Sequence, residues 1–226
     1  MNNLPLSPES MLVTFNKKMS NLFKSCLMFQ NEDIDMGFKN LVRKTVVSEI
    51  LYNKYVIAIS GLQGVGKSTL LKTMYDIPEG YIPEILGIGE KLPILITEHK
   101  ENNFVCQAKK FYKETSGQYS IKDVVIDKET FYNAAMNPTS DYIFLELLVP
   151  FKYFNNSSQS FMLLPGVEQS NDSWNSLVTH SLYCASTCIL TFNKNKFADG
   201  DNQKLVNKIQ KEFQSFNVRL IFFFVL

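Results

Sequence analysis

The stretch Tyr55–Thr69, with the sequence YVIAISGLQGVGKST, combines a short β-prone run, a glycine-rich turn and the start of a helical repeat. Residues 55–60 form a short continuous β-prone run, which is typical of a buried parallel strand. Residues 61–68 fit the pattern G-x-x-x-x-G-K-[ST] of a phosphate-binding loop (P-loop). Apolar residues then recur at helical spacing, up to Met74. The stretch therefore predicts a strand, a phosphate-binding loop and a helix in succession.

Each residue type in this loop suits the binding of a polyphosphate. Glycine at 61, 64 and 66 lets the backbone approach phosphate oxygens, because no Cβ stands in the way. The loop N–H groups converge into an anion-binding nest, and the N-terminus of the next helix adds positive charge. We expect Lys67 to contact the β- and γ-phosphates, Ser68 to ligate Mg²⁺ and Thr69 to reach the α-phosphate. The predicted nucleotide-binding residues of the loop are Gly61, Gln63, Gly64, Val65, Gly66, Lys67, Ser68 and Thr69.

Alternating strand and helix patterns predict an α/β fold, a P-loop domain with a mostly parallel sheet flanked by helices. We expect an N-terminal helical segment, similar to a neck or stalk, over residues 1–52. The P-loop domain is expected over 53–226, and its apolar final strand suggests that it is incomplete at the C-terminus. Strands are predicted at 55–60, 93–98, 103–108, 142–149, 160–164, 187–192 and 218–226, and helices after the loop and near 128–136, 171–184 and 201–214.

The composition excludes several classes of protein. There are 23 basic and 22 acidic residues, with a net charge of +1 and no basic stripe, so we expect no nucleic-acid partner. The four cysteines (26, 106, 184 and 188) show no paired spacing, which predicts reduced thiols and a cytoplasmic protein. The longest apolar run, 220–226, is shorter than the about 20 residues that span a membrane. Any membrane contact is therefore expected to be peripheral.

Further motifs point to one family. The loop carries Gln63, Leu164-Pro165-Gly166 follows an apolar strand, and a strand-then-loop pattern lies at 191–201. In these respects the chain resembles the dynamin-like large GTPases, in particular the bacterial dynamin-like proteins, over roughly residues 34–226. The resemblance implies a G domain that binds GTP and Mg²⁺, with Gln63 and Lys67 catalytic and Gly166 nucleotide-binding. It also implies homo- or hetero-oligomers with dynamin-like homologues and peripheral membrane contact during membrane remodelling.

Two positions depart from the family pattern. The aspartate that holds the water shell of Mg²⁺ corresponds to Leu163, and the switch threonine corresponds to Glu90. Leucine cannot bind a metal, although Glu168 or Asp172 could replace the aspartate. The base-reading motif would follow residue 226, so the preference for guanine rests on the resemblance alone.

These departures leave three functions open. The first is slow Mg²⁺-dependent hydrolysis of GTP coupled to self-assembly. The second is a catalytically degenerate nucleotide-binding module that partners an active homologue. The third is an ATP-binding P-loop protein, in which Glu146 ends the apolar run 143–146 as the acidic residue of a Walker B strand.

Overall fold

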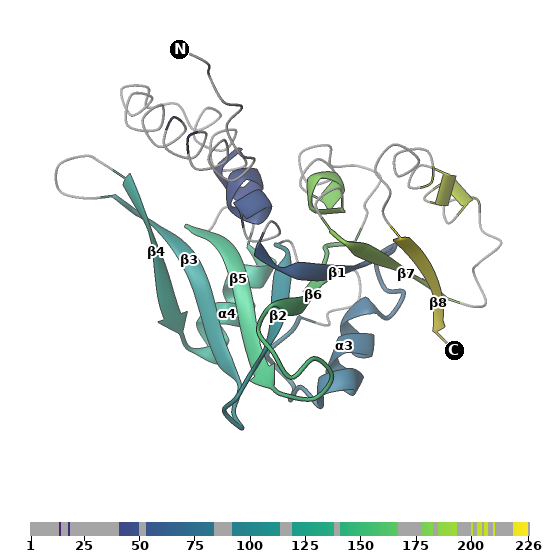
Figure 1. Ribbon diagram of the computed structural model, residues 1–226, viewed down its shortest axis with the longest axis horizontal. Coiled ribbons are helices and arrows are strands. Elements are labelled where there is room, and N and C mark those ends of the chain that lie inside the picture. Colours follow the sequence, from purple (N-terminus) through teal and green to yellow (C-terminus); the bar gives the residue numbers. More distant parts are fainter. Residues whose placement is uncertain are drawn as a thin grey trace, which may run out of the picture.

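The computed structural model describes residues 14, 18, 41–49, 53–83, 92–113, 119–137, 141–166, 178–182, 185–193, 200, 203–204, 206–207, 210 and 219–225. These residues build one eight-stranded sheet with helices on both faces (Figure 1). The strands are β1 (Tyr55–Ser60), β2 (Ile94–His99), β3 (Val105–Lys113), β4 (Tyr119–Ile126), β5 (Tyr142–Pro150), β6 (Gln159–Leu163), β7 (Thr187–Asn193) and β8 (Arg219–Val225). Helix α3 is Lys67–Tyr75 and helix α4 is Lys128–Met136, and residues 41–49 and 178–182 are also helical.

The strand order is β4-β3-β5-β2-β6-β1-β7-β8. β1 runs parallel to both of its neighbours, β6 and β7, and β7 runs parallel to β8. β2 is parallel to β5 but antiparallel to β6, and β3 is antiparallel to both β5 and β4. The prediction of an α/β fold is therefore confirmed. The sheet is mixed: the pairings β1–β6, β1–β7, β2–β5 and β7–β8 are parallel, and β2–β6, β3–β4 and β3–β5 are antiparallel.

The described strands overlap the predicted ones, with one exception, although β3 continues to Lys113 where the prediction ends at 108. Most of the predicted helices 171–184 and 201–214 lies outside the described residues. Helix α4 covers the predicted 128–136, and its N-cap Asp127 accepts a hydrogen bond of 2.8 Å from the Thr130 N–H. Strand β4 was not predicted. It lies at the edge of the sheet, where Ile121 and Val125 are exposed and Lys122 and Asp123 interrupt the apolar pattern. An edge strand of this kind lacks the apolar run by which the central strands were found.

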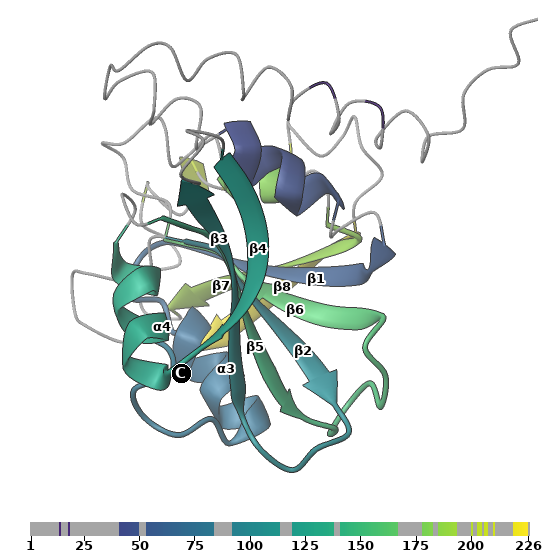
Figure 2. The same ribbon diagram turned by 90° about the vertical axis from the view of Figure 1, so that its left-hand side faces the viewer.

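Two buried clusters hold the layers together. On one face of the sheet, the helical residues 41–49 and 178–182 pack on β1, β6 and β7, with Val46 and Leu182 among the buried side chains. On the other face, α3 and α4 pack through Leu71 and Phe131 on β1, β2, β5 and β6. Figure 2 shows the 41–49 helix on one side of the sheet and α3 and α4 on the other.

Polar contacts also attach the helix of residues 41–49. The Arg43 guanidinium is 1% exposed and donates to the Tyr142 carbonyl at 3.3 Å, and burial lowers its pKa to about 10. Nε2 of His180 lies 2.8 Å from the Ser48 hydroxyl and 3.0 Å from the Lys44 carbonyl. This part of the expected N-terminal segment thus packs on the sheet. Of the predicted segment 1–52, the structure describes residues 14, 18 and 41–49, and the other residues lie outside the described ranges.

A buried glutamate fixes the connection between β5 and β6. Glu98, at the end of β2, accepts hydrogen bonds from the backbone N–H groups of Tyr153 (2.7 Å), Phe154 (2.9 Å) and Asn155 (2.8 Å). The Tyr75 hydroxyl of α3 donates a fourth, at 3.0 Å. Burial alone would raise the pKa of Glu98, but the backbone donors outweigh burial and lower it below its ordinary value. The carboxylate therefore joins α3, β2 and the 151–158 connection at one edge of the sheet.

Candidate functional site

The glycine-rich loop lies between the carboxyl end of β1 and the start of α3. Gly64 and Gly66 have positive φ angles of 73° and 89°, a backbone conformation that favours glycine. Gly66 is the N-cap of α3, and the helix begins at Lys67. The first backbone N–H groups of a helix have no partner within the helix, so they point outward at this end. The local geometry is the strand, loop and helix that the sequence predicts.

Close packing against β7 fixes the beginning of the loop. A Cβ at Gly61 would lie 2.6 Å from both the carbonyl oxygen and the hydroxyl of Thr191. The same hydroxyl donates to the Ser60 carbonyl at 3.0 Å. Glycine is therefore required here by the approach of a second strand as well as by its φ angle of 155°. Thr191 was not predicted to take part, because this contact depends on the pairing of β1 with β7.

Lys67 is buried, with 5% of its surface exposed, and its ammonium group folds back on the loop. Nζ donates to the Leu62 carbonyl at 3.1 Å and lies 3.5 Å from the Gly61 carbonyl. The positive charge is thus held over the loop backbone. A flexible four-carbon side chain can move this charge onto a bound anion without a change in the backbone.

The structure brings Gln63 and Gly166 together, as two of the predicted site residues. A Cβ at Gly166 would lie 3.0 Å from Cα and 3.1 Å from Cβ of Gln63. The side-chain Nε2 of Gln63 is buried and has no hydrogen-bond partner. A buried amide donor without an acceptor costs free energy, so an acceptor brought by a ligand would be favourable here. Ser68 and Thr69 lie in the first turn of α3, and Val65 is buried in the loop.

Among the residues that the structure describes, the loop has no carboxylate beside it that fits a resident Mg²⁺ ion. Mg²⁺ in nucleotide sites takes oxygen ligands, commonly one or two carboxylates together with phosphates and water. Ser68 supplies one hydroxyl, but Leu163 at the end of β6 is fully buried and offers only hydrocarbon. No group of three or more His, Cys, Asp or Glu side chains that could hold a metal occurs within the described ranges. Glu90, Glu168 and Asp172 lie outside those ranges.

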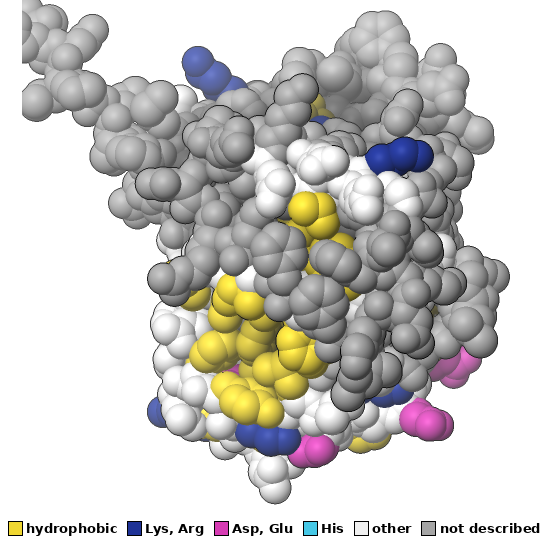
Figure 3. Space-filling view, turned by 90° about the vertical axis from the view of Figure 1, so that its right-hand side faces the viewer, with side chains coloured by type: hydrophobic (Ala, Val, Ile, Leu, Met, Phe, Trp, Pro, Cys, Tyr) yellow, Lys and Arg dark blue, Asp and Glu magenta, His cyan; other side chains and the backbone are white. Residues whose placement is uncertain are grey.

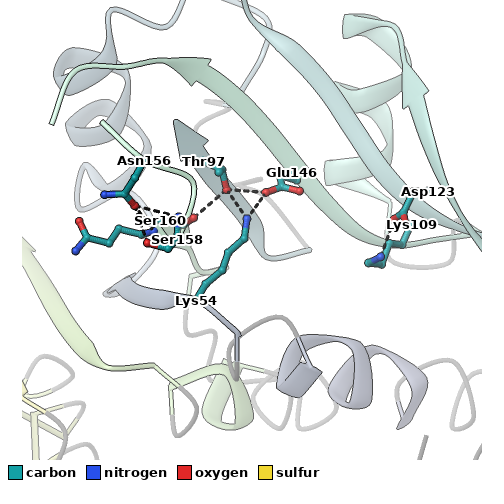
Figure 4. Close-up of polar contacts among 9 residues, drawn as sticks. Lys54, Thr97, Lys109, Asp123, Glu146, Asn156, Ser158 and Ser160 are labelled. Carbon is teal, nitrogen blue, oxygen red and sulfur yellow. Dashed lines mark hydrogen bonds and ion pairs between the residues drawn. The ribbon is translucent and has the colours of Figure 1, made fainter. Parts of the chain in front are cut away.

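Glu146 does not lie at the loop. It sits in the middle of β5, which β2 and β6 separate from β1. Its carboxylate pairs with Lys54 Nζ at 2.8 Å and accepts from the Thr97 hydroxyl at 2.6 Å, and Thr97 also contacts the Ser160 hydroxyl at 2.9 Å. Figure 4 shows Lys54, Thr97, Glu146 and Ser160 directed toward one another; Lys54 directly precedes β1, whereas the loop follows β1. The placement of Glu146 as a Walker B acid is therefore wrong.

Two of the four cysteines are described, and both are free and buried. Burial raises the pKa of the Cys106 and Cys188 thiols to about 12, so neither is a nucleophile at neutral pH.

No protein-family model matches the chain. Two solved structures to which it is similar belong to an oligomerised bacterial dynamin pair, described as a mechanism for long-range sensing and tethering of membranes. The identities are 13% and 14%, and the TM-scores are 0.40 and 0.43. The matches cover 96% and 92% of this chain but 41% and 38% of those proteins, so the chain spans about two fifths of their length. A likeness of this degree does not assign an activity, a ligand or a partner to the chain.

Among the described residues, no helix combines the length and the apolar character that crossing a membrane requires.

Proposed function

We propose that residues 61–68 form a P-loop that binds the phosphates of a nucleoside triphosphate, with GTP as the expected nucleotide. The observation that carries the proposal is the loop itself: glycines with positive φ lead into a helix that begins at the buried Lys67. The preference for guanine is taken from the resemblance of the sequence to dynamin-like GTPases.

The donors around the loop support an anionic ligand. Oxygens of a phosphate placed above the loop would accept from the N–H groups of the first turn of α3. The Gln63 amide, which has no acceptor in the structure, would gain one. The Lys67 ammonium would exchange two carbonyl contacts for a charged phosphate oxygen, which forms a stronger hydrogen bond.

Between the two GTP-related functions, the buried Leu163 favours binding without efficient turnover. Phosphoryl transfer depends on cations and donors that stabilise the transition state, and the aspartate that helps hold Mg²⁺ is replaced here by hydrocarbon. Slow hydrolysis with Gln63 and Lys67 as catalytic residues remains a prediction of the resemblance. Phosphate release, measured in the binding experiment below, separates the two functions.

Binding of GTP and ATP to the wild-type chain and to Lys67→Ala tests the proposal. We expect wild-type binding, with GTP preferred, and a loss of at least about tenfold in affinity for Lys67→Ala, since a charged hydrogen bond contributes about 1.5–3 kcal/mol. Lys72→Ala is the matched control, because Lys72 lies in the last turn of the same helix and its loss should leave the affinity unchanged. Absence of binding by the wild type, or equal binding by Lys67→Ala, would contradict the proposal.

Self-association is the second part of the proposal, and an apolar surface favours it. Ile221 and Phe223 are 44% and 41% exposed. Because they lie two positions apart, their side chains share one face of the outermost strand β8. Figure 3 shows hydrophobic side chains gathered on the side of the molecule where Figure 1 places β8 and α3. Exposed apolar patches of this kind mark surfaces of association. Sedimentation of the chain with and without GTP would show whether oligomers form. Peripheral membrane contact rests on the sequence resemblance alone.

A further inference from the structure

The strands end along two edges of the sheet, one beside the loop and one opposite it. Carboxylates are distributed unevenly between these two edges. The loop lies at the edge that contains the carboxyl ends of β1, β6 and β7 and the amino ends of β2 and β5. Of the carboxylates that the structure describes, only Asp141 lies at this edge, before β5, and two strands separate β5 from β1. The other described carboxylates lie in mid-strand or toward the opposite edge: Glu49, Asp76, Glu79, Glu98, Glu101, Asp123, Asp127, Glu129 and Glu146.

The position that corresponds to the metal-holding aspartate of the dynamin-like GTPases carries an apolar side chain, Leu163. Leu163 pairs with Ile59 across the β1–β6 ladder, two residues before the loop begins. It is fully buried in the same cluster as Leu71 of α3. A carboxylate at this position could support a Mg²⁺ ion held by Ser68 and phosphate oxygens, but two methyl groups cannot.

The groups that do surround the loop can neutralise phosphate charge directly. The N-terminus of α3 carries the positive end of the helix dipole, and Gly64 and Gly66 have the positive φ angles with which successive N–H groups can form an anion-binding nest. Lys67 adds a full positive charge, and Gln63 adds an amide donor that has no acceptor. All of these groups attract anions, and none of them needs a bridging cation.

We propose that the loop binds nucleotide phosphates without a divalent cation, so that free GTP rather than Mg²⁺-GTP is its ligand. The inference rests on the proposed nucleotide-binding function and specifies the form of the ligand. It departs from the expectation, drawn from the sequence resemblance, that Mg²⁺ is a cofactor of the site. Because Mg²⁺ also withdraws charge from the triphosphate, the ion should weaken binding to the donors and the cation that the structure describes around the loop.

Titration of the full chain with GTP in excess MgCl₂ and in excess EDTA tests the inference. We expect the affinity in EDTA to equal or exceed the affinity in MgCl₂. Affinity that falls by about tenfold or more in EDTA, a difference of about 1.4 kcal/mol, would overturn the inference and leave the proposed function intact. Absence of GTP and ATP binding in both buffers would overturn the proposed function as well, so the two failures can be told apart.

Leu163→Asp provides a gain-of-function test, with Leu163→Asn as the control of similar size. We expect only the aspartate variant to acquire tighter GTP binding in MgCl₂ than in EDTA. Equal behaviour of two folded variants would overturn the role assigned to position 163. Since a buried aspartate can prevent folding, circular dichroism is recorded for each variant. Where a variant does not fold, the comparison of wild-type binding in MgCl₂ and in EDTA decides the inference.

Discussion

The two edges of the sheet around β1 differ in how far the chain satisfies its own polar groups. At the edge where β1 begins, Glu98 accepts from three backbone N–H groups and a tyrosine hydroxyl, and Lys54 and Glu146 pair directly. At the edge where β1 ends, glycines turn the backbone and the Gln63 amide lacks an acceptor. At the first edge, these polar groups find their hydrogen-bond partners within the chain, and the contacts hold the fold together. At the second edge, the Gln63 amide donor has no acceptor within the chain, which is typical of a binding site.

The largest expected effect comes from breaking the first edge at Glu98. Replacing Glu98 with alanine removes the acceptor of four buried donors, so we expect the free energy of unfolding to fall by about 3 kcal/mol. Urea denaturation followed by circular dichroism measures the change. Glu101→Ala, in the exposed turn after β2, is the control and should be indistinguishable from the wild type. Equal stability of Glu98→Ala and the control would show that the network does not hold this edge.

The same carboxylate predicts a dependence on pH. Its pKa is lowered in the folded protein, so its contribution is present above the ordinary glutamate pKa of about 4.3. The contribution is lost as the pH falls through the folded pKa. The difference in stability between the wild type and Glu98→Gln should therefore shrink on acidification below about pH 4.3. A difference that is constant or grows in this range would contradict the ionised carboxylate.

A smaller effect is expected from two glycines at the second edge. Gly61→Ala brings a Cβ against the Thr191 backbone, and we expect a loss of about 2 kcal/mol. Gly64→Ala meets no atom within 4 Å and retains only the strain of its positive φ, which predicts a loss of about 1 kcal/mol. Thermal unfolding of both variants shows which one loses more stability. A larger loss for Gly64→Ala than for Gly61→Ala would mean that the approach of β7 does not determine the start of the loop.

The smallest effect is expected from the half-buried ion pair of the first edge. Lys54→Met keeps the apolar part of the side chain and leaves Glu146 with its Thr97 hydrogen bond, so the loss should stay below about 1 kcal/mol. Chemical denaturation at low and high salt measures it, and the difference from the wild type should decrease with salt. A loss as large as that of Glu98→Ala would place this pair among the groups that hold the edge.

The sequence predicted well those parts of the molecule that depend on local pattern. The run before Gly61, the loop and α3 follow from neighbouring residues alone, and the N-cap of α4 likewise. The β3–β4 hairpin and the contact between Gly61 and Thr191 could not be predicted, because they depend on which strands become neighbours. Glu146 was misplaced for the same reason. An acidic residue after an apolar run indicates a strand, but not the position of that strand in the sheet.

Glycine-selective ¹⁵N labelling tests the central claim most directly, because it reports the loop backbone itself. The chain has ten glycines, and three of them, Gly61, Gly64 and Gly66, lie in the loop, whereas Gly80 follows the far end of α3. On addition of GTP, we predict that the amide signals of the three loop glycines shift the most and that Gly80 is unaffected. Unchanged loop signals at saturating GTP, or shifts confined to glycines outside the loop, would contradict the assignment of residues 61–68 as the phosphate-binding site.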